Sequence, residues 1–240
     1  MATHWEDLSV DGGTMNSFVA EPESPGKHAG IVVIMGAGGI DDTLQELVAD
    51  LAAHDFTAIA PYLFHRDQSD SDGRTKAGQL VDPNIVSDVN SAIEYLQRRP
   101  SVDGERIGIV GFCLGGRVSY LMATQRPDAI RAAAVYYGGN IMVPRGDGPS
   151  PFEQTSSIQC PIIGLFGADD ENPSPDDISK IGAELSRLGK HHEFHSYANA
   201  GHGFMGKSGA GYREHAANDA WPKTLNWFEK HLQGSPVALT

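Results

Sequence analysis

Short apolar runs bounded by glycine or proline recur along the chain and predict six strands. The runs are Gly30 to Met35, Phe56 to Ala60, Ile107 to Phe112, Ala132 to Tyr137, Pro161 to Phe166 and His192 to Tyr197. In the intervals between several of these runs, the apolar residues instead follow the spacing of one face of a helix.

Three such amphipathic stretches are complete enough to predict helices. Their apolar faces are Leu44, Leu47, Val48 and Leu51; then Val86, Val89, Ile93 and Leu96, ahead of Pro100; and then Ile178, Ile181, Leu185 and Leu188, which stop at Gly189. A last helix is predicted around Trp221 to Leu232, with Asp219 as its N-cap and Pro222 in the first turn, where proline is tolerated.

Strands that alternate with helices predict an α/β fold whose mostly parallel sheet is covered by helices on both faces. The length of 240 residues fits one domain over residues 1–240. Two polar or Gly/Pro-rich stretches are predicted as loops. One is Val143 to Pro151, and the other, His65 to Pro83, is a candidate lid over the strand ends.

Composition and charge narrow the possible partners. A hydrophobic fraction of 40% with 20% charged residues is ordinary for a globular enzyme. The net charge of -13 opposes binding to nucleic acids or anionic membranes. The N-terminal segment lacks the pattern of a signal peptide, and no segment has the apolar length of a membrane span, so we expect a cytoplasmic protein.

The segment most informative about chemistry is Gly111–Phe112–Cys113–Leu114–Gly115, which follows an apolar strand and precedes a helical pattern. This G-x-C-x-G arrangement predicts a nucleophile elbow with cysteine in place of serine. A helix N-terminus at Cys113 would favour its thiolate, the form that attacks carbonyl groups. A free cysteine is more often a small buried apolar residue, and we interpret the second one, Cys160, in that way.

A thiol nucleophile needs a base, and the next two strands each end in a candidate. Asp169 and Asp170 follow the fifth predicted strand, and His202 follows the sixth. The chain order of nucleophile, acid and histidine is that of the α/β-hydrolases, which predicts a Cys113–His202–Asp relay. Residue spacing alone leaves the choice between the two aspartates open.

The glycine-rich segment from Met35 to Asp41 follows the first predicted strand. It lacks the third glycine of a dinucleotide-binding loop, and Asp41 and Asp42 would repel a pyrophosphate. We predict instead that the backbone N–H of Ala37 joins that of Leu114 in an oxyanion hole. The loop thus gives no support for a dinucleotide cofactor, and no metal is expected, because His191, His192 and His195 lack the partner ligands and geometry of a zinc site.

Three motifs together resemble the dienelactone hydrolase family, also called carboxymethylenebutenolidases. They are Gly111 to Gly116, Phe166 to Pro175 and Ala200 to Phe204, and the segments Ala60 to Phe64 and Tyr136 to Gly138 are also similar. The resemblance covers almost the whole chain. It implies an α/β-hydrolase fold, and it implies hydrolysis of small esters or lactones by Cys113, His202 and Asp170 through a thioester and without a cofactor.

The chain departs from the family pattern at two positions. Well-studied members have a glutamate near the thiol where this chain has Gly36, and an arginine that holds the substrate carboxylate where it has Gly206. Arg66, Arg74 or Lys207 are the candidates to replace that arginine. Tyr137 and Phe204, in the shared motifs, are further candidate substrate-binding residues.

Two rival hypotheses keep the same fold. The first is a ligand-binding or thiol-sensing protein with little catalysis, since a fold does not by itself define a function. The second is a cysteine peptidase or thioesterase, for which the loops show no sign of a peptide groove or acyl channel. The sequence leaves the natural substrate and the oligomeric state open.

Overall fold

Eight strands form one sheet in the computed structural model, which describes residues 1–233. They are β1 (Ala2–Val10), β2 (Gly13–Glu21), β3 (His28–Ile34), β4 (Phe56–Pro61), β5 (Val102–Phe112), β6 (Ile130–Tyr136), β7 (Ile162–Gly167) and β8 (His192–Tyr197). The strand order is β1-β2-β4-β3-β5-β6-β7-β8, and β3 to β8 run parallel. The six predicted strands are thus confirmed as β3 to β8.

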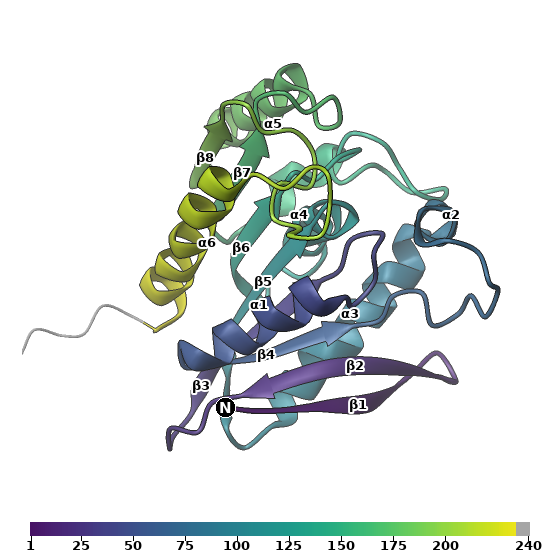
Figure 1. The fold of residues 1–240 in the computed structure, drawn as a ribbon, viewed down its shortest axis with the longest axis vertical. Helices are drawn as coiled ribbons and strands as arrows, with labels where there is room; N and C mark the ends of the chain where they lie inside the picture. The colour runs from purple at the N-terminus through teal and green to yellow at the C-terminus, as the bar shows by residue number, and fades with distance from the viewer. Residues whose placement is uncertain (234–240) are drawn as a thin grey trace, which may run out of the picture.

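Helices cover both faces of the sheet, as predicted. They are α1 (Asp42–Ala53), α2 (Gly73–Gln79), α3 (Asp82–Arg98), α4 (Leu114–Gln125), α5 (Pro175–Arg187) and α6 (Glu214–Phe228), with the short segments η1 (Phe152–Ser157) and η2 (Glu229–Gln233). In Figure 1, α1 and α6 lie in front of the sheet, and α3 and α4 lie behind it. Among residues 1–233, no helix combines the length and the apolar character needed to cross a membrane.

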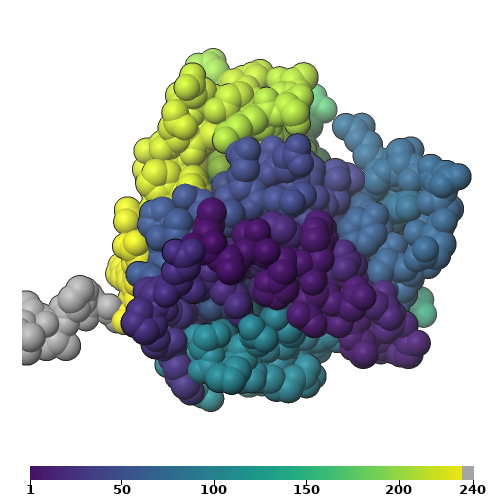
Figure 2. Space-filling model, turned by 60° about the horizontal axis from the view of Figure 1, so that its bottom comes forward, coloured from purple at the N-terminus to yellow at the C-terminus, as the bar shows by residue number. Residues whose placement is uncertain are grey.

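The apolar runs of the sequence did not predict the antiparallel hairpin of β1 and β2, which lies on the surface in Figure 2. In β1 the buried residues are Leu8 and Val10, two positions apart, and in β2 Met15 is followed by two polar residues before the short apolar run Phe18 to Ala20, so neither strand forms a long apolar run. The turn residues Asp11 and Gly12 have φ of 48° and 77°, the backbone that a two-residue Asp-Gly hairpin turn requires. The Asp-Gly dipeptide is therefore the sequence signal that could have predicted this hairpin.

Two local predictions were wrong. The stretch from His65 to Pro83 is not a continuous loop, because Asp72 caps the short helix α2 through the N–H groups of Arg74 and Thr75. This short helix lies in a polar stretch, so its N-cap is not accompanied by the apolar periodicity that predicts a helix.

The start of the last helix was also predicted wrongly, since α6 begins at Glu214 and Asp219 is not its N-cap. The carboxylate of Asp219 instead binds the Lys223 ammonium at 2.6 Å and the Tyr197 hydroxyl at 2.9 Å. Pro222 lies inside the helix, where it costs one backbone hydrogen bond. Buried Ala216 and Ala217 extend the helix toward its N-terminus by packing against the core.

Candidate active site

Cys113 alone forms the turn between β5 and α4, with φ of 59° and ψ of −117°. A non-glycine residue with positive φ is strained, and such strain is often found at functional sites. A Cβ at Gly111 would overlap the backbone of Gly115, and one at Gly115 would overlap the carbonyl of Ile34. The flanking glycines therefore allow the close approach that this elbow needs.

His202 follows β8 and Asp170 follows β7, so both lie at the carboxyl ends of strands, on the same side as Cys113. His202 Nδ1 lies 2.9 Å from Asp170 Oδ2, and Asp170 Oδ1 accepts a hydrogen bond from the N–H of Asn172 at 2.9 Å. Asp170 is 6% exposed, whereas Asp169 faces solvent. The geometry thus pairs the histidine with Asp170.

The environment of the Cys113 thiol favours its charged form. Burial raises the pKa of Cys113, but hydrogen bonding to His202 and its charge, with the N–H groups of Leu114 and Ala37, bring the pKa below its ordinary value. Burial opposes the imidazolium of His202, but Asp170 and Cys113 outweigh it and raise the pKa of His202 to about 10. Both shifts favour the charged forms of the two groups, a thiolate beside an imidazolium.

The backbone N–H groups of Ala37 and Leu114, proposed from the sequence as an oxyanion hole, both face the Cys113 sulfur. A Cβ at Gly36 would lie 3.3 Å from the Cβ of Cys113, so the chain after β3 passes directly beside Cys113. The N-terminus of α2 closes over this segment, and a Cβ at Gly73 would overlap the carbonyl of Ala37.

Two cavities meet at the thiol, and both are lined by Cys113, His202, Ala37 and Arg74. The larger, which we call the glycine cavity, has a volume of about 510 Å³ and is bounded by residues 36–39 and by residues of the 203–211 segment. The smaller, which we call the arginine cavity, has a volume of about 210 Å³. A ligand bound beside Cys113 can thus extend in two directions.

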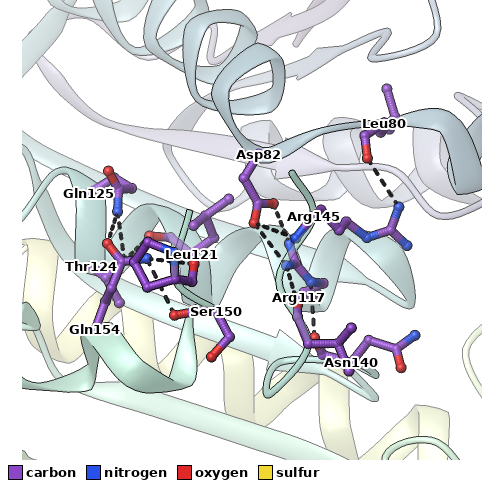
Figure 3. A network of polar contacts seen from close by, with 12 residues as sticks. Leu80, Asp82, Arg117, Leu121, Thr124, Gln125, Asn140, Arg145, Ser150 and Gln154 are labelled. Atoms are coloured by element: carbon purple, nitrogen blue, oxygen red, sulfur yellow. Dashed lines mark hydrogen bonds and ion pairs between the residues drawn. The ribbon is translucent and has the colours of Figure 1, made fainter. Parts of the chain in front are cut away.

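The arginine cavity carries an excess of positive charge. Its lining includes Arg74, Arg117 and Arg145 but, within residues 1–233, no carboxylate. Arg117, 1% exposed, holds both oxygens of Asp82 at 2.6 and 3.0 Å (Figure 3). The guanidinium of Arg145 instead reaches the carbonyls of Ala77 and Leu80. Within residues 1–233, the Asp82 carboxylate therefore pairs with Arg117, and the hydrogen-bond partners of the Arg145 guanidinium are carbonyls.

Sequence reasoning missed both Arg117 and Arg145. Arg117 lies on α4 four residues after Cys113, and Arg145 lies in the predicted Val143 to Pro151 loop. Only the tertiary fold brings that loop against α2 and α4, so no local pattern could have identified Arg145.

Of the other candidate substrate-binding residues, Arg74 and Tyr137 lie at the site. Arg74 lines both cavities, and the buried ring of Tyr137 lines the glycine cavity with its centroid 5.1 Å from that of His202. Phe204 is fully buried and packs its ring against that of Tyr137 at 5.0 Å. Phe204 therefore supports the site from behind.

Arg66 and Lys207 line neither cavity and are paired elsewhere. Arg66 binds the buried carboxylate of Asp88 and, at 2.6 Å, that of Asp11. Lys207 binds Glu46 at 2.7 Å. Neither side chain is placed to hold a substrate carboxylate at Cys113.

The remaining cysteine and the histidine cluster lie away from the two cavities. Cys160 is buried, and burial raises the pKa of its thiol to about 12, as expected for a structural residue. His192 and His195 lie on β8, at an edge of the sheet. Within residues 1–233, no three His, Cys, Asp or Glu side chains are grouped as metal ligands.

The lowered pKa of Cys113 beside His202 predicts an unusual pH dependence of alkylation. The rate of carboxamidomethylation of Cys113 by iodoacetamide should reach its midpoint below the ordinary thiol value of 9.0. In His202→Gln the midpoint should move upward, because burial then dominates the pKa of Cys113. Mass spectrometry of the peptide carrying Cys113 measures the rate, and an identical midpoint in both proteins would contradict the pairing.

Comparison with known proteins finds similar chains over almost the full length of this one. The model of the dienelactone hydrolase family matches residues 15–232. A Synechocystis protein assigned as a carboxymethylenebutenolidase is 29% identical, over 90% of this chain and 92% of its own. A Bradyrhizobium protein assigned as a 2-oxo-3-(5-oxofuran-2-ylidene)propanoate lactonase is 29% identical, over 98% of this chain and 96% of its own.

A solved structure has a similar fold. The crystal structure of a Klebsiella pneumoniae protein assigned as a dienelactone hydrolase matches with a TM-score of 0.84 and 26% identity. The match covers 96% of this chain and 100% of the other. It confirms the α/β-hydrolase fold predicted from the sequence.

Proposed function

Because the chain belongs to the dienelactone hydrolase family, we propose that it hydrolyses small esters or lactones with Cys113 as nucleophile, His202 as base and Asp170 as the residue that orients the base. The observation that supports this most strongly is the placement of the thiol. Cys113 faces the Asp170-paired imidazole and two backbone N–H groups, at the junction of two cavities.

In the proposed reaction, the Cys113 thiolate attacks the carbonyl carbon, and the carbonyl electron pair moves to the oxygen. The N–H groups of Ala37 and Leu114 stabilise that oxyanion. As the intermediate collapses, the carbon–oxygen ester bond breaks, and the His202 imidazolium protonates the departing alkoxide. A lactone ring opens in the same step, and either substrate leaves a thioester on Cys113.

Water completes the cycle. His202, now neutral, takes a proton from a water molecule as the water oxygen attacks the thioester carbonyl. Cleavage of the carbon–sulfur bond releases the acid and restores the thiolate beside the imidazolium. In this scheme His202 activates the thiol, so the absence of a family glutamate at Gly36 does not leave the nucleophile without a partner.

Steady-state kinetics with p-nitrophenyl acetate and a set of small lactones test the proposal. An enzyme gives saturable turnover that continues long after one equivalent of product per Cys113. A thiol sensor would give at most one equivalent of product and would instead undergo reversible Cys113 oxidation at low peroxide concentration. That second outcome would reject hydrolysis as the function.

The charge of the arginine cavity predicts a preference for esters that carry an anionic group. Burial, and after it the charge of the neighbouring Arg117, lower the pKa of Arg145, so this guanidinium is partly buried beside a second one. A guanidinium nevertheless keeps its proton in proteins, so Arg145 offers a charged donor to an anion. The carboxylate of a substrate half-ester could bind there.

Arg145→Met should reduce kcat/KM for the p-nitrophenyl half-ester of succinate by about 10- to 100-fold, the effect of one charged hydrogen bond. The value for neutral p-nitrophenyl acetate should stay within about twofold, which reports an intact site. Arg131→Met, an exposed arginine paired with Glu105, is the matched control for net charge. Equal losses on both esters in Arg145→Met would mean that Arg145 acts only on the structure of the site.

A further inference from the structure

A third cavity, which we call the tail chamber, opens between helices α1 and α6 and has a volume of about 310 Å³. Residues of α1 and of α6 line it together with residues of the segment that follows His202. In Figures 1 and 2 these parts of the chain, far apart in sequence, lie directly side by side. None of the assigned catalytic residues lines this chamber.

The tail chamber adjoins the glycine cavity. Thr43, Leu47 and Met205 line both spaces, so they form the boundary between them. A group that extends from Cys113 along the glycine cavity into the chamber would pass these three side chains. The two spaces together have room for a ligand larger than a single lactone ring.

The lining of the chamber selects for an apolar group. Leu47, Met205 and Ala217 contribute aliphatic surface, and Tyr212 and Trp221 contribute aromatic rings. Binding of an apolar chain against such side chains is favoured in proportion to the area removed from water.

The polar groups of the chamber are largely paired with each other. The indole Nε1 of Trp221 donates to Asp50 at 2.7 Å, and the Lys207 ammonium donates to Glu46 at 2.7 Å. The carboxylates of Glu46 and Asp50 would also repel an anionic tail. This end of the cleft thus contrasts with the arginine cavity, where positive charge is in excess.

We propose that the tail chamber binds the apolar tail of the ester that Cys113 attacks, so that the preferred substrates are neutral-tailed esters longer than acetate. This inference rests on the proposed hydrolase function and adds to it the class of group that is recognised. Each methylene that is fully buried should raise kcat/KM by up to about fourfold.

Two homologous series test the proposal: p-nitrophenyl esters of acids from acetate to decanoate, and acetate esters of alcohols from ethanol to decanol. We expect kcat/KM to rise by more than about 30-fold along at least one series, as methylenes enter the chamber. Flat profiles in both series, with acetate turned over, would overturn this inference and leave the proposed function standing. Failure to turn over any ester would reject the function itself.

The variant Asn218→Trp tests whether the rise of kcat/KM with chain length arises in the tail chamber. Asn218 is exposed on α6 and lines the chamber, so an indole there should fill it without disturbing the core. We expect the rise with chain length to be lost while acetate turnover stays within about twofold. Glu214→Trp, exposed on the same helix but outside the chamber, should keep the rise. An unchanged rise in Asn218→Trp would place the tail elsewhere and overturn the assignment.

A binding measurement tests the proposal independently of turnover. Calorimetric titration with decan-1-ol should show saturable binding to the wild-type protein and to Glu214→Trp, and at least about tenfold weaker binding to Asn218→Trp. Equal affinities in all three proteins would contradict an apolar site between α1 and α6.

Discussion

Cys113→Ala should lose at least about 10⁴-fold in kcat/KM for p-nitrophenyl acetate, because removal of a nucleophile eliminates the covalent route and leaves only binding and the oxyanion hole. Alanine keeps the Cβ and removes only the sulfur. The strained backbone at φ of 59° is set by β5, α4 and the flanking glycines, so we expect the variant to fold. Initial rates measured with excess ester report the loss.

Cys160→Ala is the matched control for this experiment. It removes the other thiol, which is buried away from the cavities at Cys113, and it should leave the rate within about twofold. Circular dichroism and thermal melting of both variants separate loss of chemistry from loss of fold. Full activity in Cys113→Ala would remove this residue from the mechanism and with it the proposed thioester.

The elbow was the part of the site that the sequence predicted best, because its physical cause is local. Gly111 and Gly115 flank Cys113 within one turn, and the backbone clashes that would exclude larger residues there come from the elbow and the adjacent strand β3. A pattern of five consecutive residues can therefore indicate it. The apolar runs of β3 to β8 were predictable for a similar reason, since a buried strand needs apolar side chains over its own length.

Features that depend on tertiary contacts were harder to predict from the sequence. Asp169 and Asp170 are adjacent in the chain, and only the fold shows that Asp170 is buried against His202 while Asp169 is exposed. Lys207 lies five residues after the histidine, yet α1 presents Glu46 to it, and it turns away from the thiol. Arg145 reaches the site because its guanidinium hydrogen-bonds to carbonyls at the end of α2.

The two ends of the cleft suggest how the chain could select substrates without the arginine that the family pattern places at Gly206. Gly206 lines the glycine cavity, which leads toward the tail chamber, whereas the positive charge lies on the other side of Cys113, with Arg117 and Arg145. The proposed substrate is therefore held by charge at one end and by apolar contact at the other. A carboxylate and an apolar tail on opposite sides of the ester bond would satisfy both.

Asp170→Asn should lower kcat by about 10³- to 10⁴-fold with little change in KM, because an amide can still bind the His202 ring but does not stabilise the imidazolium or enforce the reactive tautomer. Asparagine keeps the side-chain oxygen that accepts from the N–H of Asn172, so the loop after β7 should stay in place. Asp169→Asn, the exposed neighbour, should remain within about twofold of wild type.

The pH profile distinguishes this role from a structural one. Asp170 is among the groups that raise the pKa of His202, so its loss should lower the pH at which the imidazolium loses its proton. The Cys113 thiolate then loses its counterion at that lower pH, and burial pushes the pKa of the thiol upward. In Asp170→Asn, the midpoint of Cys113 alkylation should therefore shift to higher pH, whereas Asp169→Asn should match wild type. A large loss of kcat in Asp169→Asn, with Asp170→Asn active and unshifted, would assign the supporting carboxylate to Asp169.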